Sequence, residues 1–393
     1  MRRSEWLRLA AIPLELLMVP FFVVIAAMAR FWPKRFDVGI GPDRLITSIY
    51  HKQALQRVGY RVETFAPGGT YITQEFDVTL SGWQSNALGV FLSPYVLLAR
   101  ALFTYRCLFF YFYGGCLNRP VIGRLEPLLY ALAGTKVVVM PYGSDVQVMT
   151  RSRNLHFRHA MGIDYPDIIL NHRRIARNVD RWTRHADWVI GGCEWVDYML
   201  RWDTLMSGHF AIDLERWKPL PTPPSNGTFK VLHAPNHKAV KGTQYLVDAV
   251  EQLKREGYDI ELVLLQRVSN DRIREAMAEV DLVADQFVIG WYAMFAMEAM
   301  AMEKPVLCYL RDDLVELYAK TGVLPPGDLP ILNTGPLDVA DRLRWAYAHR
   351  DELPELGRRG RAFLEKHHSI EAIGRVFADI LPRIGIAPSG ARG

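Results

Sequence analysis

The order of segments along the chain predicts an α/β protein built from two doubly wound, Rossmann-like domains that face a cleft. A strand-helix-strand alternation begins at Phe36, and a second one begins at Phe229, behind the proline-rich tract 219–227. The chain has 393 residues, and 50% of them are hydrophobic. This length is large for a single core and suits two domains of ordinary size.

Residues 9–29 form an apolar run in which Glu15 is the only charge. The run reaches the roughly 20 residues that a bilayer-spanning helix needs, but Pro13 and Pro20 interrupt it. The flanking cations are Arg2, Arg3, Arg8, Arg30, Lys34 and Arg35. Because both flanks are basic, the pattern favours an in-plane or re-entrant membrane-associating helix within residues 1–35. A signal peptide cleaved after Ala29 and a buried core helix remain alternatives.

The first domain is expected at residues 36–218. Its predicted elements are strands at 36–40, 60–65, 136–140 and 186–190 and a helix at 45–58. The loop after the first strand contains Gly41, Pro42 and Asp43, and we expect it to face the cleft and contact an acceptor. Asp145 lies in the loop after the third predicted strand, where it is either a functional residue or the cap of the next helix.

Residues 87–117 are rich in aromatic side chains and are interrupted by Arg100 and Arg106. Aromatics next to arginines are typical of a membrane interface, where such a helix could seat a polyprenyl-phosphate acceptor. A helix of the protein core is the alternative.

The second domain is expected at residues 229–367, after a linker at 219–228. Its predicted strands are 229–234, 260–265, 282–284 and 306–310, and its main helices start at Thr243, as a cap, and at Tyr292. Residues 368–393 are expected to form a last helix that crosses back to the first domain, followed by a tail.

Residues 285–310 carry the most informative pattern. Residues 285–289 favour a strand, Gly290 breaks the run, and the helix formers from Tyr292 onward predict a helix. We expect the backbone N–H groups of Gly290 and Trp291 to lie at its N-terminus, where they favour a phosphate. Glu298 lies about two turns further along this apolar helix, and a ribose diol would be a suitable partner for its carboxylate.

This block resembles the donor-binding segment of glycosyltransferase family 4, whose members are two-domain enzymes of the GT-B fold. The family motif has two glutamates eight positions apart. Glu298-Ala299-Met300-Ala301, with Lys304-Pro305-Val306 behind it, matches the second half of the motif. Gly290 stands at the first glutamate, and Trp291-Tyr292-Ala293 replaces the Gly-aromatic-Gly turn. The resemblance implies that Glu298 contacts the ribose of the donor. The first glutamate of the motif, which contacts the donor sugar in the family, has no counterpart here.

Lys241-Gly242 resembles the family's Lys-Gly pair, whose Lys neutralises the donor diphosphate. Asn236 takes the place of the family's Arg, so His237 and Lys238 are candidates for the second charge. Tyr142 stands where many relatives have His. The catalytic residues that the resemblance implies are Lys241, Glu298, Tyr142 and Asp145. The donor-binding residues that it implies are Asn236, His237, Lys238, Lys241, Gly290, Trp291, Tyr292, Ala293, Met294 and Glu298.

The resemblance also implies a retaining transfer from a nucleotide-diphosphate sugar, as co-substrate without a further cofactor, to a lipid-linked or glycan acceptor. The sequence has no Asp-x-Asp pair, so no metal is expected.

A net charge of +5 without an aromatic-interleaved basic stripe predicts no nucleic-acid partner. The four cysteines lack CxxC spacing and suit reduced thiols. We expect a peripheral or monotopic protein on the cytoplasmic face of a membrane.

Two other classes remain open. One is a catalytically silent membrane-bound partner that keeps the fold, which Gly290, Tyr142 and Asn236 at three family positions suggest. The other is a dinucleotide oxidoreductase, which the strand-helix-strand start suggests. The glycine pair at Gly39 and Gly41 lacks the third glycine of that fingerprint.

Overall fold

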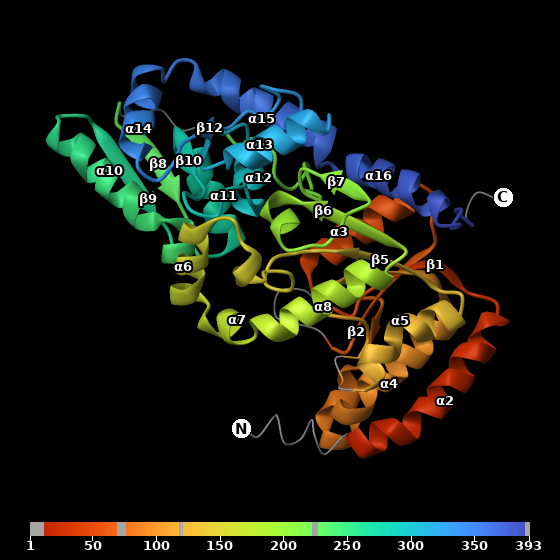
Figure 1. Cartoon of the computed structure of the whole chain (residues 1–393). Coiled ribbons are helices and arrows are strands. Elements are labelled where there is room, and N and C mark those ends of the chain that lie inside the picture. The colour runs from red at the N-terminus through yellow and green to blue at the C-terminus, as the bar shows by residue number, and fades with distance from the viewer. Residues whose placement is uncertain (1–11, 69–75, 118, 120, 222–226, 390–393) are drawn as a thin grey trace.

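The computed structural model describes residues 12–68, 76–117, 119, 121–221 and 227–389. Two parallel β-sheets, each flanked by helices, form two lobes (Figure 1). We call them the N-terminal lobe and the C-terminal lobe. The predicted architecture of two doubly wound lobes with an apolar N-terminal helix is confirmed.

The sheet of the N-terminal lobe has seven parallel strands in the order β3-β2-β1-β4-β5-β6-β7. Their bounds are β1 Phe36–Ile40, β2 Val62–Ala66, β3 Val78–Thr79, β4 Tyr105–Tyr111, β5 Lys136–Met140, β6 Trp188–Gly192 and β7 Thr204–Met206. The central strands are apolar and buried, as expected for parallel strands covered on both faces. The order reverses between β1 and β4, so the carboxyl ends of these strands border a crevice.

The helices of this lobe are α2 Ile12–Arg30, α3 Ile46–Arg57, α4 Ala87–Thr104, α5 Ile122–Leu132, α6 Leu155–Asp164, α7 Pro166–Leu170 and α8 His172–His185. The prediction of one aromatic helix over 87–117 is wrong, because its second half is the central strand β4. Phe109 and Phe110 are at most 1% exposed there. The two arginines form ion pairs inside the lobe, Arg100 with Glu63 and Arg106 with Asp37.

The sheet of the C-terminal lobe has five parallel strands in the order β12-β11-β10-β8-β9. They are β8 Phe229–His233, β9 Ile260–Leu264, β10 Leu282–Ala284, β11 Val306–Cys308 and β12 Leu332–Asn333. The helices are α9 Lys238–Lys241, α10 Thr243–Arg255, α11 Asn270–Ala278, α12 Met294–Ala301, α13 Asp312–Lys320, α14 Val339–Ala348 and α15 Leu353–His367.

Two local predictions in this lobe are wrong. Thr243 does not cap α10, because Gly242 holds the cap position in the left-handed conformation, and the Thr243 hydroxyl pairs with His233 Nε2 at 3.0 Å. The β-rich residues after Asp285 do not extend the strand. β10 ends at Ala284, and the chain runs as a loop to Ala293 because the side chain of Gln286 binds its backbone groups.

The last helix, α16 (Ile370–Arg383), lies on the N-terminal lobe against α3 (Figure 1). Ser369 caps it, and its apolar face, with Ile373 and Phe377, is fully buried. A Cβ on Gly374 would meet the Ala54 carbonyl oxygen at 2.6 Å, so this glycine permits the close approach of the two helices.

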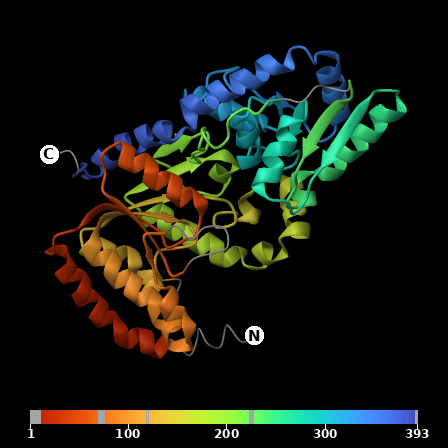
Figure 2. The same ribbon diagram turned by 180° about the vertical axis from the view of Figure 1, so that it is seen from behind.

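Helix α2 packs along α4 and α5 at the edge of the N-terminal lobe (Figures 1 and 2). Phe22, Ala26 and Ala29 are buried in this contact. Glu15 is also buried, and its carboxylate accepts hydrogen bonds from the Val121 and Ile122 N–H groups at 2.9 and 3.1 Å. These N–H groups lie at the start of α5, so α2 is an integral part of the lobe. The first residues of the apolar run, up to position 11, lie outside the described residues, as do Arg2, Arg3 and Arg8.

Candidate functional site

A cleft of about 470 Å³ lies between the lobes, at the carboxyl ends of strands from both sheets. Parallel α/β sheets bind their ligands at this edge. The N-terminal lobe lines the cleft with the polar residues Thr47, Tyr142, Ser144, Gln147 and Glu194. The C-terminal lobe lines it with Asn236, His237, Lys241, Trp291, Tyr292, Ala293, Met294 and Phe295, among others. Most of the predicted donor-binding residues are therefore brought together.

Lys241 reaches the cleft from the end of α9, and its ammonium group donates to Asp285 Oδ1 at 2.5 Å. The Asp285 side chain is fully buried, while the Lys241 side chain is 16% exposed. The second oxygen of Asp285 accepts from the Ala293 N–H at 2.9 Å. Asp285 thus ties Lys241 to the start of α12. An ammonium group has three donors, so Lys241 keeps N–H groups for a ligand in the cleft.

The expected phosphate site at Gly290 is not present in the predicted form. Helix α12 starts at Met294, and the Gly290 N–H donates to Gln286 Oε1 at 3.3 Å. The Gly290 carbonyl accepts from the Arg311 N–H at 2.9 Å. The free N–H groups of the helix N-terminus therefore lie after Ala293, within the segment 293–295 that lines the cleft.

Gly290 cannot be replaced by a larger residue without rearrangement. Its φ of +97° lies in the region that glycine tolerates best, and a Cβ there would meet Arg311 Cγ at 2.5 Å. The Arg311 side chain is 6% exposed and donates to both oxygens of Asp197 in the N-terminal lobe, at 2.7 and 3.1 Å. The space for a side chain at position 290 is therefore filled by an arginine that joins the two lobes.

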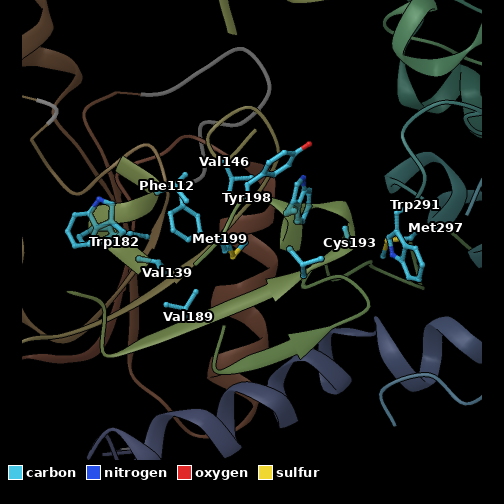
Figure 3. Close-up of a cluster of buried hydrophobic side chains, with 14 of the residues drawn as sticks. Phe112, Val139, Val146, Trp182, Val189, Cys193, Tyr198, Met199, Trp291 and Met297 are labelled. Carbon is cyan, nitrogen blue, oxygen red and sulfur yellow. The ribbon is translucent and has the colours of Figure 1, made fainter. Parts of the chain in front are cut away.

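Trp291 and Tyr292 border the cleft, but their side chains mainly hold the lobes together. Trp291 is 1% exposed, stacks on Tyr318 and donates from Nε1 to the Ser207 carbonyl at 2.7 Å. The Tyr292 hydroxyl pairs with His368 Nε2 at 2.8 Å. Figure 3 shows Trp291 next to the buried residues of the N-terminal lobe, with which it forms one apolar cluster.

Glu298 lies on α12, but unlike Met294 and Phe295 it is not among the residues that line the cleft. Burial raises the pKa of its carboxyl to about 8, and the Asp285 carboxylate adds to this rise. The positive charges of Arg216 and Lys241 oppose it. Because the Glu298 carboxyl is partly protonated and lies near two cations, its charge depends on which ligand binds beside it.

Tyr142 lines the cleft, with its ring edge-on to Tyr111 at a centroid distance of 5.4 Å. Burial raises the pKa of its hydroxyl far above neutrality, so it acts as a hydrogen-bond donor and not as a base. Asp145 accepts from the N–H groups of Phe112, Tyr142 and Gly143 at 2.8 to 3.1 Å. Burial raises its pKa to about 7, and the geometry gives it a structural role in the loop that presents Tyr142.

The predicted acceptor residues Gly41, Pro42 and Asp43 lie beside the cleft, and only their neighbours Leu45 and Thr47 line it. A Cβ on Gly41 would meet the Phe65 carbonyl oxygen at 2.1 Å, so this loop is packed against β2. Burial raises the pKa of Asp43 to about 8, with a contribution from the Asp145 carboxylate.

His237 and Lys238 are the candidates for the positive charge that Asn236 lacks. His237 lines the cleft, and its ring packs on Tyr165 of the N-terminal lobe at a centroid distance of 4.1 Å. Asn236 also lines it, while Lys238 is exposed on α9 outside the lining. Arg216 is a further cation near Glu298, which the sequence analysis missed.

Asp285, Gln147 and Glu194 were not predicted as site residues. Glu194 follows the end of β6, and the rule that ligands bind at the carboxyl ends of parallel strands could have indicated it. Within the part of the chain that the structure describes, no group of three or more His, Cys, Asp or Glu side chains could hold a metal ion.

No protein-family model and no curated protein matches the chain. Solved structures do match its fold. HepE from Anabaena, in complex with UDP and glucose, has a TM-score of 0.55 at 15% identity over 88% of this chain and 100% of that chain. Sucrose-phosphate synthase from Thermosynechococcus elongatus gives 0.55 at 14% identity over 90% and 99%. A glycosyltransferase from Rickettsia africae gives 0.56 at 12% identity over 90% and 99%.

The chain therefore has the GT-B fold, and the fold predicted from the resemblance is confirmed. Membership of family 4 in particular stays a prediction.

Proposed function

We propose that the protein is a glycosyltransferase that moves a sugar from a nucleotide-diphosphate sugar to an acceptor. The observation that carries this proposal is the convergence of Lys241 and the start of α12 in a cleft between two GT-B lobes. A cation and a helix N-terminus together form a binding site for a diphosphate. HepE, a structure with the same fold, was solved with UDP and glucose.

In the proposed reaction the diphosphate leaves as the bond to the anomeric carbon breaks. Lys241 and the N–H groups after Ala293 would stabilise the negative charge that grows on the leaving group. Asp285 would hold Lys241 in place through their hydrogen bond. Retention of configuration and independence from metal are part of the proposal, and no residue is assigned as a covalent nucleophile.

The test is a thermal-shift screen of the purified protein with UDP, GDP and ADP, with their sugar conjugates, and with the nicotinamide dinucleotides NAD and NADP. A ligand that binds only the folded protein raises its melting temperature, by an amount that grows with the logarithm of ligand concentration. We expect one nucleotide sugar to stabilise the protein and to be consumed when an acceptor is added. Binding without any turnover would instead favour the catalytically silent partner, and a shift only with nicotinamide dinucleotides would favour the oxidoreductase.

The Glu298→Gln variant extends this test. If the Glu298 carboxylate accepts two ribose hydroxyls, the variant should lose roughly tenfold or more in donor affinity, the value of hydrogen bonds to a charged group. In the wild type, donor affinity should rise with pH as Glu298 ionises around its pKa of about 8. The variant should lose this pH dependence above pH 7.5. Calorimetric titration at pH 7.5 and 9 measures both effects. If donor affinity depends on pH in the same way in the wild type and the variant, Glu298 does not contact the donor.

We also propose that α2 attaches the protein to the cytoplasmic surface of a membrane, where a lipid-linked acceptor would be bound. Among the described residues, α2 is the one helix long and apolar enough to cross a bilayer, yet one side of it packs on the lobe. Its outer side carries a stripe of exposed apolar residues at helical spacing. We call this stripe the lipid face; it consists of Leu17, Phe21, Val24 and Met28 on α2 and of Phe31, which directly follows the helix.

The exposed fractions of the lipid face range from 56% to 86%. Leu88 on α4 and Leu128 on α5 add further exposed apolar surface. Arg30 and Arg35 are exposed beside the end of the stripe, where they would meet anionic headgroups. An apolar stripe of this kind with cations at its end is typical of a helix lying in a membrane surface.

The Leu17→Glu/Phe21→Glu double variant should lose at least tenfold in binding to vesicles of phosphatidylcholine and phosphatidylglycerol. Burial of each large apolar side chain contributes about 1.5 to 3 kcal/mol. Its melting temperature should stay unchanged, because both positions face outward. Leu337→Glu, at a position that is 88% exposed on the C-terminal lobe, is the matched control and should bind vesicles normally. Vesicle sedimentation measures the result, and undiminished binding of the double variant would contradict the proposal.

A further inference from the structure

The C-terminal lobe has no acidic side chain where the resemblance expects the contact to the donor sugar. Gly290 occupies that position, and the Arg311 side chain packs against it so closely that even a Cβ would overlap with it. A sugar in the cleft would still need acceptors for its hydroxyl groups, because a buried hydroxyl without a partner costs free energy.

The same arginine fixes a segment of the opposite lobe. Arg311 binds Asp197 through two hydrogen bonds, and Asp197 ends the 3₁₀ helix Cys193–Asp197, labelled η3. At the other end of this turn, the Cys193 N–H donates to the Tyr318 hydroxyl of α13 at 2.7 Å. The C-terminal lobe therefore holds η3 from both ends.

Glu194 lies on η3 between these two contacts and lines the same cleft as Lys241. It is only 5% exposed, and its neighbour in the cleft wall, Gln147, is 9% exposed. A nearly buried carboxyl that lines a cleft is expected to have a polar partner there. Burial raises its pKa to about 7, and the Gln147 side chain is among the groups that oppose this rise.

We propose that Glu194, together with Gln147, binds hydroxyl groups of the donor sugar from the N-terminal lobe, in place of the glutamate that the Gly290 position lacks. This inference rests on the proposed function. A carboxylate accepts two hydroxyl hydrogen bonds and an amide both accepts and donates, so the pair suits a hexose with adjacent hydroxyls. The contact forms only while η3 stays fixed to the C-terminal lobe through Arg311.

The test compares a nucleotide sugar with its own nucleoside diphosphate in the wild type and in Glu194→Gln. The probe is the pair that stabilises the wild type most among UDP with UDP-glucose, GDP with GDP-mannose and ADP with ADP-glucose. We expect Glu194→Gln to bind the nucleoside diphosphate within twofold of the wild type. Its affinity for the nucleotide sugar, or kcat/KM for its transfer, should fall roughly tenfold to a hundredfold, the range for lost bonds to a charged group.

Glu279→Gln, an exposed glutamate at the end of α11, is the matched control and should change neither affinity. Gln147→Ala is the second variant, and it should show the same selective loss to a smaller extent. If Glu194 and Gln147 only support the fold, both variants would lower the melting temperature while the two affinities keep their ratio, which overturns the inference. If no nucleotide sugar binds the wild type, the proposed function fails with it. If one binds and both variants keep its full affinity, only the inference fails.

Discussion

Replacing Lys241 with alanine is expected to lower kcat by about 10²- to 10³-fold at saturating donor, the usual loss when one group that stabilises transition-state charge is removed. The charge of Lys241 is needed most as the diphosphate departs, so the loss should appear in kcat beyond any change in KM. Lys241→Arg should restore only part of the rate, because a planar guanidinium does not place its charge where the ammonium does. Steady-state kinetics with the donor found in the screen measures both values.

The structure adds a second effect to this variant. Without Lys241 the Asp285 carboxylate stays fully buried and loses its counter-charge, which costs about 3 to 5 kcal/mol of stability. The Lys241→Met/Asp285→Asn double variant removes both charges and should recover most of the melting temperature while remaining inactive. If the double variant also recovered activity, the loss in Lys241→Ala would come from stability alone, and the leaving-group role would be wrong.

The second large effect is expected at the ion pair between the lobes. Arg311→Leu leaves Asp197 only 3% exposed and without its guanidinium, so the variant should lose about 3 to 5 kcal/mol of stability. It should also release η3, and with it Glu194, from its position in the cleft. Thermal unfolding should show a drop of roughly 5 °C, because the shift equals the lost stability divided by the unfolding entropy, which is large for a chain of 393 residues.

Two controls separate the charge from the packing. Arg311→Leu/Asp197→Leu removes both members of the buried pair and leaves only Asp313, which Arg311 also binds and which is 45% exposed, so the double variant should be clearly more stable than the single variant. Arg272→Leu breaks an ion pair with Glu275 whose partners are 52% and 59% exposed, and should change stability by less than about 1 kcal/mol. Equal melting temperatures for Arg311→Leu and Arg272→Leu would show that the pair between the lobes contributes no more than a surface pair.

The sequence predicted the elements whose pattern is local. The strands β1, β5 and β10 lie at the predicted residues, because continuous apolar runs bounded by turns indicate buried parallel strands. The last helix was predicted within residues 368–393, and α16 occupies Ile370–Arg383 with Ser369 as its cap. Lys241, Ala293 and Met294, three of the predicted donor-binding residues, line one cleft.

The errors occurred where side-chain contacts, local or distant, decide the structure. Residues 285–289 favour a strand by composition, but Gln286 binds the N–H groups of Val288, Ile289 and Gly290 and forms a loop. A side chain at position 290 would overlap with Arg311, which lies on another segment. Glu194 enters the cleft because Tyr318 and Arg311 hold its turn, and neither contact leaves a pattern in a single sequence.

The chain passes from one lobe to the other twice, first before Phe229 and again before α16. The segments that lead into these two crossings are in contact with each other. Before the first crossing, the Ile212 N–H donates to the His368 carbonyl at 2.9 Å, and Ile212 forms a parallel bridge with Ser369, where the second crossing begins. Two covalent connections at one place act as a hinge, because they allow rotation of the lobes but resist sliding. Any opening of the cleft would therefore separate the lobes most at contacts away from this hinge, such as the hydrogen bond from the Val240 N–H of α9 to Asp164 of α6.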